Sequence, residues 1–477
     1  MSFSPFAAPL AVLPPCFPHD VPQDIRQDHK HEKDRELEVV ADPKKTLTVA
    51  TMKTFDALAT VCVHDAGDVY AVALDLAKGI NVVVASNHKA GVPVHALRRL
   101  EGVWHHMQTA ARNADVTAIV QRSRKVAVFR TIPEFEALHR SFVIEQYRYS
   151  WPALLNRVHN EIARALDVVQ RALNQPFTAV ELVAAPGFAG YFAELQTAFL
   201  QKLSHRLADV TTGVLNCQRG DDDLVALHTL LHGAQDAVQP ALREKNKDDK
   251  WMSELLDNLS RCSGVPVRGI LQDFFALVSA VTHLSSFCHL RAFSRFEGLD
   301  VTVLAAKPVQ GRFRIDPSHP DVYARVHFLY DASDDGLDLN FESDLEASIE
   351  RPLRAYCIQL GDNDSVIDIH PEASLLNIVH TMCGAVAYIG TSSLACLYCY
   401  RLFQAHNADC EHKFLIRGSN GLPSVFWSAP GLPCSSSRVI LQRLHDTLRR
   451  DFVRSAGVMY ARRSLERRSE GSGRALQ

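Results

Sequence analysis

The sequence predicts a mixed α/β fold that ends in a three-layer α/β/α sandwich. Short apolar runs typical of strands occur toward both ends of the chain, and amphipathic helical patterns fill its middle. In the last third, helical and strand patterns alternate, as they do when helices cover both faces of a sheet. We therefore divide the chain into a leader, a small α/β region, a mainly helical region, the sandwich, and a C-terminal helix with an Arg-rich tail, at 1–47, 48–134, 135–297, 298–440 and 441–477.

The leader and the small α/β region differ in composition. Residues 22–45 are dense in charge and poor in large apolar side chains, which predicts a flexible leader. Apolar runs at 69–74 and 81–85 predict a hairpin or adjacent strands, and the periodicity over 94–113 predicts a helix. A further strand is expected at 126–129.

The middle of the chain carries amphipathic patterns almost throughout. These patterns predict helices at 151–173, 188–210, 224–242, 251–262 and 267–293. We expect this region to be a scaffold or a docking platform for a protein partner rather than a second active site.

The sandwich region alternates between strand and helix patterns. Strands are expected at 300–304, 324–330, 354–360, 385–389 and 414–417. Helices are expected after His370, over 394–406, and over 438–452. Pro371 fits the first turn of its helix, where the backbone amide has no partner in any case.

One motif in the sandwich carries chemistry. His370 and Glu372 form H-x-E, and Cys396 and Cys399 form the only C-x-x-C of the chain, 26 residues after His370. H-x-E alone is weak evidence in a chain with 22 His, and a second copy lies at 159–161. One imidazole and two thiolates suit zinc with an open position for water, and a carboxylate beside the metal can carry protons. The alternative is a structural zinc site or a pair of buried thiols.

The residues around this motif also resemble a known family. The segments AYIGTSSLACLYCYRLF and KFLIRGSNGLPSVFWSAP are similar to the deaminase-like proteins of fungi and some intracellular bacteria, within the zinc-dependent cytidine and nucleic-acid deaminase superfamily. The resemblance is strongest over 355–430. It implies the cytidine-deaminase fold, with His370, Cys396 and Cys399 as zinc ligands and Glu372 as the proton shuttle.

The motif predicts hydrolytic deamination of a nucleobase. Zinc would lower the pKa of a bound water, and the resulting hydroxide would attack the amino-bearing ring carbon of cytosine or adenine while Glu372 moves protons. The base could be free, part of a nucleotide, or part of single-stranded nucleic acid. The second hypothesis is a catalytically inactive binding module that keeps zinc as a structural element.

Substrate contacts are expected in the loops around the motif. By position, the candidates are Asn363, Thr391, Ser392, Ser393, Asn420 and Trp427. Two of them depart from the family that the sequence resembles, which often has Lys in place of Ser393 and His in place of Asn420. Trp427 is equally consistent with a core residue.

Composition restricts the classes of function. A net charge of −3 argues against a protein whose main task is gripping a nucleic-acid backbone. The eleven cysteines follow no framework of spacings, which indicates a reduced, intracellular protein. No run of about eighteen apolar residues occurs, so no membrane association is expected. Eight arginines in the last thirty residues predict either a solvated tail or a contact with nucleic acid.

Overall fold

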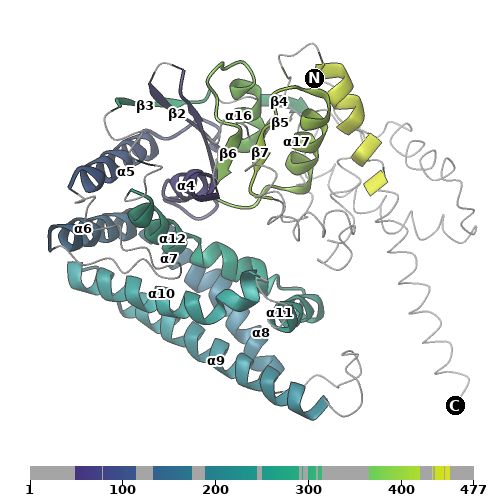
Figure 1. The fold of residues 1–477 in the computed structure, drawn as a ribbon. Helices are drawn as coiled ribbons and strands as arrows, with labels where there is room; N and C mark the ends of the chain where they lie inside the picture. Colours follow the sequence, from purple (N-terminus) through teal and green to yellow (C-terminus); the bar gives the residue numbers. More distant parts are fainter. Residues whose placement is uncertain are drawn as a thin grey trace, which may run out of the picture.

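A mixed five-stranded sheet with helices on both sides lies beside a bundle of helices in the computed structural model (Figure 1). The structure describes residues 49–77, 79–113, 133–174, 189–243, 250–288, 293, 299–307, 310–313, 365–418, 432, 436–444, 446–448 and 450–451. The predicted leader, the Arg-rich tail after residue 451, and the predicted strands at 126–129, 324–330 and 354–360 lie outside these residues. Within them, the protein is mostly helical.

The sheet has the strand order β3–β2–β1–β6–β7. Strands β1 (Tyr70–Asp75) and β2 (Ile80–Ser86) form an antiparallel hairpin, and β1 also pairs antiparallel with β6 (Tyr388–Thr391). Strand β3 (Val301–Ala305) pairs parallel with β2, and β7 (Leu415–Ile416) pairs parallel with β6. The central strand β1 therefore runs against the other four.

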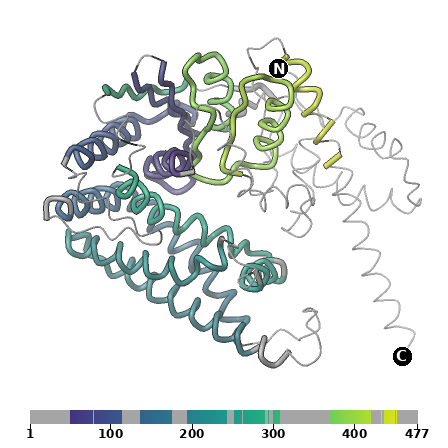
Figure 2. The backbone as a smooth tube through the Cα atoms, viewed as in Figure 1, coloured from purple at the N-terminus to yellow at the C-terminus, as the bar shows by residue number. Residues whose placement is uncertain are grey.

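The sheet combines two regions that the sequence analysis separated. The hairpin belongs to the range 48–134, whereas β3, β6 and β7 belong to 298–440, so the five-stranded sheet is built from both ranges. Ala71 pairs with Thr391 across that boundary, and Figure 2 shows the two segments side by side. The physical reason is that both hairpin strands are buried on both faces, and such strands need a pairing partner and a layer of helices on each side.

The two faces of the hairpin carry side chains of different size. One face packs against α4 (Val49–Thr60) and presents the larger residues Tyr70, Val72, Leu74, Ile80, Val82 and Val84. The other packs against α16 (Pro371–Val379) and α17 (Leu397–Asp409) and presents Ala71, Ala73, Val83 and Ala85. Because successive side chains point to opposite faces, this alternation lets α16 lie close to the sheet.

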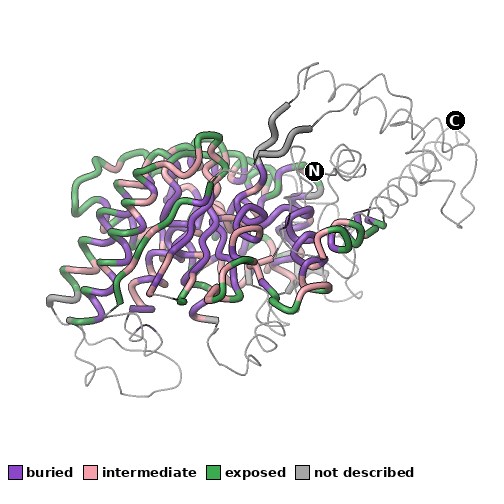
Figure 3. The backbone as a smooth tube through the Cα atoms, turned by 90° about the horizontal axis from the view of Figure 1, so that it is seen from above, coloured by how far each residue is buried: buried purple, intermediate pink, exposed green. Residues whose placement is uncertain are grey.

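Helices of the middle region form the bundle. They start close to the predicted positions, but α9 and α12 end six residues away from the predicted ends, and α6 was not among the predicted helices. With α5 (Val94–Asn113), which contacts β3, the helices are α6 (Pro133–Tyr149), α7 (Trp151–Arg157), the π-helical turn η1 (Val158–Ile162), α8 (Ala163–Asn174), α9 (Ala189–Asn216), α10 (Asp221–Arg243), α11 (Lys250–Ser263) and α12 (Val267–Phe287). In the view of Figure 3, buried segments run through the middle of the molecule.

Helix α12 joins the bundle to the sheet. Among the described residues it is the one helix long and apolar enough to cross a membrane, judged by length and composition alone, and 56% of that apolar window is buried. It packs against α4, α10 and α11, and eleven of its side chains are buried. The apolar side chains of α12 therefore pack inside the protein, where they contact α4, the helix that covers β6.

A last helical segment, at 437–444, 446–448 and 450–451, closes the face that carries α17. Ile440, Leu444 and Leu448 share a core with α17. The buried guanidinium of Arg401 donates to both carboxylate oxygens of Asp451, at 2.8 and 2.9 Å. Breaking a buried ion pair leaves an uncompensated charge in the interior, which is costly. The pair therefore holds the segment against α17.

The packing of α4 on β6 leaves no space for a side chain at Gly390. A Cβ there would lie 2.2 Å from the carbonyl carbon of Phe55. We expect Gly390→Ala to lower the free energy of unfolding by about 3 kcal/mol, because backbone must move to accommodate it. The control, Gly102→Ala, adds a Cβ on the exposed face of α5 with nothing within 4 Å, and helix propensity there favours alanine by about 0.5–1 kcal/mol. Urea unfolding of both variants measures the difference, and equal effects would contradict the close packing.

Candidate metal centre

His370 lies where a strand leads into helix α16. Strands β4 (Gln310–Phe313) and β5 (Ser365–Asp368) form a separate antiparallel pair that ends just before it. His370 is the N-cap of α16, and Pro371 occupies the first turn, as its missing amide hydrogen allows. The backbone amide of Ser374 donates to the carbonyl of His370 at 2.9 Å and closes that turn.

Cys396 and Cys399 lie at the start of α17. Cys396 has an extended backbone, with φ −67° and ψ 162°, and is the N-cap of the helix. The helix therefore begins at Leu397 rather than at 394, as the sequence pattern predicted. The Cys396 sulfur accepts a hydrogen bond from the backbone amide of Cys399 at 3.4 Å. The N-terminal end of a helix favours thiolates, because its backbone amides carry partial positive charge.

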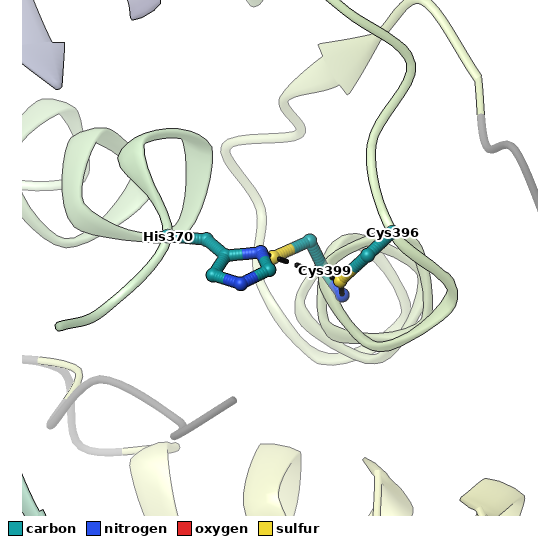
Figure 4. A group of neighbouring side chains, drawn as sticks. All are labelled: His370, Cys396 and Cys399. Carbon is teal, nitrogen blue, oxygen red and sulfur yellow. Dashed lines mark hydrogen bonds between the residues drawn. The ribbon is translucent and has the colours of Figure 1, made fainter. Parts of the chain in front are cut away.

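The three side chains converge from the two helix ends (Figure 4). Their ligand atoms all lie within 4.8 Å of one another, and Nδ1 of His370 lies 3.4 Å from Sγ of Cys396. An imidazole nitrogen and a thiolate bound to one tetrahedral zinc ion would be about 3.5 Å apart, given their usual bond lengths to zinc. The donor set and its spacing therefore fit a metal ion of this kind.

Glu372 is buried beside these three residues. Its side chain is 5% exposed, and Oε1 lies 3.9 Å from Nδ1 of His370. Burial raises the pKa of this carboxyl above its ordinary value, although the neighbouring His370 acts in the opposite direction. A raised pKa is a property that general acids and bases among buried carboxyl groups share.

The environment of Cys396 favours its ionised form. Burial by itself would raise the pKa of the thiol, but hydrogen bonds from Cys399 and His370 together lower that pKa well below its ordinary value. The thiolate is the form of cysteine that binds metals.

Residues from the N-terminal part of the chain hold the segment that leads to Cys396. Asp56 on α4 accepts hydrogen bonds from the hydroxyl of Tyr388 at 2.8 Å and from the amide of Thr391 at 3.0 Å. The amide of Ser392 donates to the carbonyl of Tyr70, and the amide of Tyr70 donates to Oγ of Ser392, both at 2.9 Å. Tyr70 and Ser392 are 322 positions apart, so the cysteine loop depends on a distant part of the sequence.

The structure places three of the six expected substrate residues. Thr391 ends β6 on the face that carries α16 and α17, and its buried hydroxyl has no hydrogen-bond partner among the described residues. Ser392 is buried and joined to β1, whereas Ser393 is half-buried. The other three candidates, Asn363, Asn420 and Trp427, lie outside the described residues.

The sequence analysis missed the anchoring role of Asp56. The available signal was a single acidic residue in the largely buried helix VATMKTFDALAT. An isolated carboxylate on a buried helix needs hydrogen-bond donors nearby, which here come from β6. The second H-x-E, at 159–161, lies in η1 and belongs to no group of metal-ligating side chains in the described part of the chain.

Comparison of the chain with models of protein families, with curated proteins and with solved structures found no match.

The ligand assignment predicts how the metal content responds to substitution. We expect Cys396→Ala and Cys399→Ala each to lose about one bound zinc ion per chain and to lower the thermal midpoint, because thiolate ligation couples metal binding to folding. Glu372→Gln should keep that zinc, since a neighbouring carboxylate that is not a ligand contributes no metal bond. Elemental analysis of the purified full chain measures this. Zinc lost from Glu372→Gln would make the carboxylate a ligand and the site a closed, structural one.

The anchoring bonds predict a graded loss of stability. Asp56→Ala removes both acceptors of the β6 bonds and should lower the free energy of unfolding by about 3–6 kcal/mol, because each of the two bonds to the carboxylate contributes about 1.5–3 kcal/mol. Tyr388→Phe removes only one of the two bonds and should cost less. Denaturant unfolding of both variants tests the order, and a larger loss for Tyr388→Phe would refute it.

Proposed function

We propose that the protein is a zinc-dependent hydrolytic deaminase of a nucleobase. The observation that carries the proposal is the buried carboxyl of Glu372 beside a set that has three, not four, metal-ligating side chains among the described residues. Structural zinc sites use four protein ligands, whereas catalytic sites use three and leave one position for water or substrate. The zinc deaminases share this arrangement of one His, two Cys and a glutamate that is not a ligand.

The reaction replaces an amino group on the base by oxygen. The zinc would supply a water made acidic enough to lose a proton near neutral pH. Glu372 takes that proton and delivers it to the ring nitrogen next to the amino-bearing carbon. The oxygen of that water bonds to the carbon. Glu372 transfers the second proton of the water to the amino group, and the C–N bond breaks to release ammonia. One water is consumed for each ammonia released.

The order of elements supports the proposal. Over the segment that resembles deaminase-like proteins, helix α16, strand β6, helix α17 and strand β7 follow one another in the chain and carry the His/Cys set. The two metal-bearing helix ends, His370 before α16 and Cys396 before α17, lie on the same side of the sheet. We take the cytidine-deaminase type of sandwich as the architecture behind this site.

Thr391 provides a polar contact for the substrate. Its hydroxyl is buried, faces the helices of the candidate metal centre, and lacks a hydrogen-bond partner among the described residues. A buried hydroxyl without a hydrogen bond costs free energy. The edge of a nucleobase offers both hydrogen-bond donors and acceptors that could pair with it. The net charge of −3 favours a base, nucleoside or nucleotide over a polymer.

A reduced, intracellular setting fits the thiol chemistry. None of the eight cysteines within the described ranges is in a disulfide, and two of them are the proposed zinc ligands. We assign the helical bundle a scaffolding role, with its outer surface open to a protein partner.

Ammonia release tests the proposed activity. Full-length protein is incubated with cytosine, cytidine, adenosine, their nucleotides and single-stranded oligonucleotides, and ammonia and the deaminated base are measured together. We expect at least one substrate to turn over, and Glu372→Gln to reduce the rate by about 10²–10⁴-fold while keeping zinc, because it cannot accept the proton. Glu101→Gln, on the exposed face of α5, makes the same chemical change away from the site and should leave the rate unchanged.

Two outcomes would contradict the proposal, the first its activity and the second its mechanism. Zinc-loaded protein that releases no ammonia from any of these substrates would favour a binding module with structural zinc. Turnover that Glu372→Gln leaves intact would remove the carboxyl from the reaction.

A further inference from the structure

A second group of metal-ligating side chains lies at the opposite ends of the same two helices. His380 is the C-cap of α16, His406 lies in the last turn of α17, and Cys410 is the C-cap of α17. At 1.5 Å per residue, the nine residues of α16 separate the two groups by about 14 Å. The second group is therefore distinct from the candidate metal centre and shares no residue with it.

The three ligand atoms of this group are as close together as those of the first. They all lie within 4.8 Å of one another. Nδ1 of His380 lies 3.1 Å from Nε2 of His406, and the two rings are nearly perpendicular, at 88°. Two imidazole nitrogens on one tetrahedral zinc ion would be about 3.3 Å apart, from the usual Zn–N bond length. A small rotation of the half-buried His380 side chain would make room for an ion between the two nitrogens.

The surroundings of His406 fix which of its two ring nitrogens carries the proton and which carries the lone pair. The amide group of Asn407 is oriented by two bonds to Phe414, since Nδ2 donates to the carbonyl at 2.7 Å and Oδ1 accepts from the amide at 2.9 Å. Oδ1 of Asn407 therefore faces Nδ1 of His406, at 3.3 Å, and Nδ1 must carry the proton. The lone pair is left on Nε2, which points at His380. An imidazole held by a hydrogen bond at its other nitrogen is the usual arrangement of a metal-ligating histidine.

We propose that His380, His406 and Cys410 bind a second zinc ion, which joins the C-terminal ends of α16 and α17. His406 is fully buried, whereas His380 and Cys410 are half-buried, so the ion can enter from the solvent side. Two imidazoles and one thiolate suit zinc better than hard ions such as Mg²⁺ or Ca²⁺.

A structural zinc site has four protein ligands, and the fourth ligand of this site has two candidates. Cys383, three residues after His380, and His412, two residues after Cys410, are both exposed. No carboxylate belongs to this group in the described residues. The ion is therefore structural: it holds the far ends of the two helices whose near ends carry His370 and Cys396, and its presence does not depend on any deaminase activity.

Zinc content of the full chain tests this proposal. We expect about two zinc ions per chain in the wild type, about one in Cys410→Ser, and none in the triple variant Cys396→Ala, Cys399→Ala, Cys410→Ser. His380→Gln changes a half-buried ligand and should also lose one ion, which guards against a folding defect peculiar to Cys410→Ser. The control, Cys262→Ser on the exposed surface of α11, should keep both ions.

Cobalt provides a second, spectroscopic readout of the same site. With Co²⁺ in place of zinc, the double variant Cys396→Ala, Cys399→Ala should still show a thiolate-to-cobalt absorption band from Cys410, and the triple variant should lose it. Wild-type protein with one zinc that Cys410→Ser and His380→Gln both retain would overturn the second site. Zinc that only the Cys410 and His380 variants lose would instead support this site and refute the first one.

Discussion

Antiparallel pairing of β1 with β6 is the interaction on which the rest of the structure depends. It joins Ala71 to Thr391 and so brings the N-terminal hairpin against the segment that carries the His/Cys set. Closing a loop of this length costs only about 2 kcal/mol more than closing one a tenth as long, because the entropy grows with the logarithm of length. Burial of β1 and β2 on both faces offsets that cost, and the helical bundle can therefore be accommodated between β2 and α16 without separating the strands.

The pairing of β1 with β6 positions the residues of the candidate metal centre. β1 bonds to Ser392 through two backbone groups of Tyr70, and α4 bonds to β6 through Asp56, so the segment before Cys396 is held from two directions. The small side chains Ala71 and Ala73 on the same strand let α16 approach, which sets the position of His370. Once the helix ends meet, burial raises the pKa of Glu372, and the same burial excludes the bulk water that would otherwise screen its charge.

Local patterns were enough to predict most elements and which His and Cys side chains come together, but not how the elements pair. The hairpin, the bundle helices and the convergence of His370 with Cys396 and Cys399 follow from periodicity and spacing. The shared sheet does not, because no local pattern specifies that β1 pairs with a strand more than 300 residues away; its uniformly apolar sequence indicated only burial on both faces. For the same reason Ser392, expected to contact substrate, turned out to bond to β1. The group of His380, His406 and Cys410 was missed because its members meet only when α16 and α17 lie together.

The two His/Cys groups differ in the features that distinguish a catalytic metal site from a structural one. The first has two thiols, one imidazole and a buried carboxyl 3.9 Å from the imidazole, a set that in our proposal places a proton acceptor beside an open metal position. The second has two imidazoles and one thiol, with Asn407 fixing the tautomer of His406 and no carboxylate in the group. In our proposal the first group is catalytic, and a catalytic centre must hold its ligands to within a fraction of an ångström. Contacts of α16 with β1 and β2 and of α17 with β7 already restrain these two short helices. The second ion that we propose would add a link between their C-terminal ends without entering the reaction.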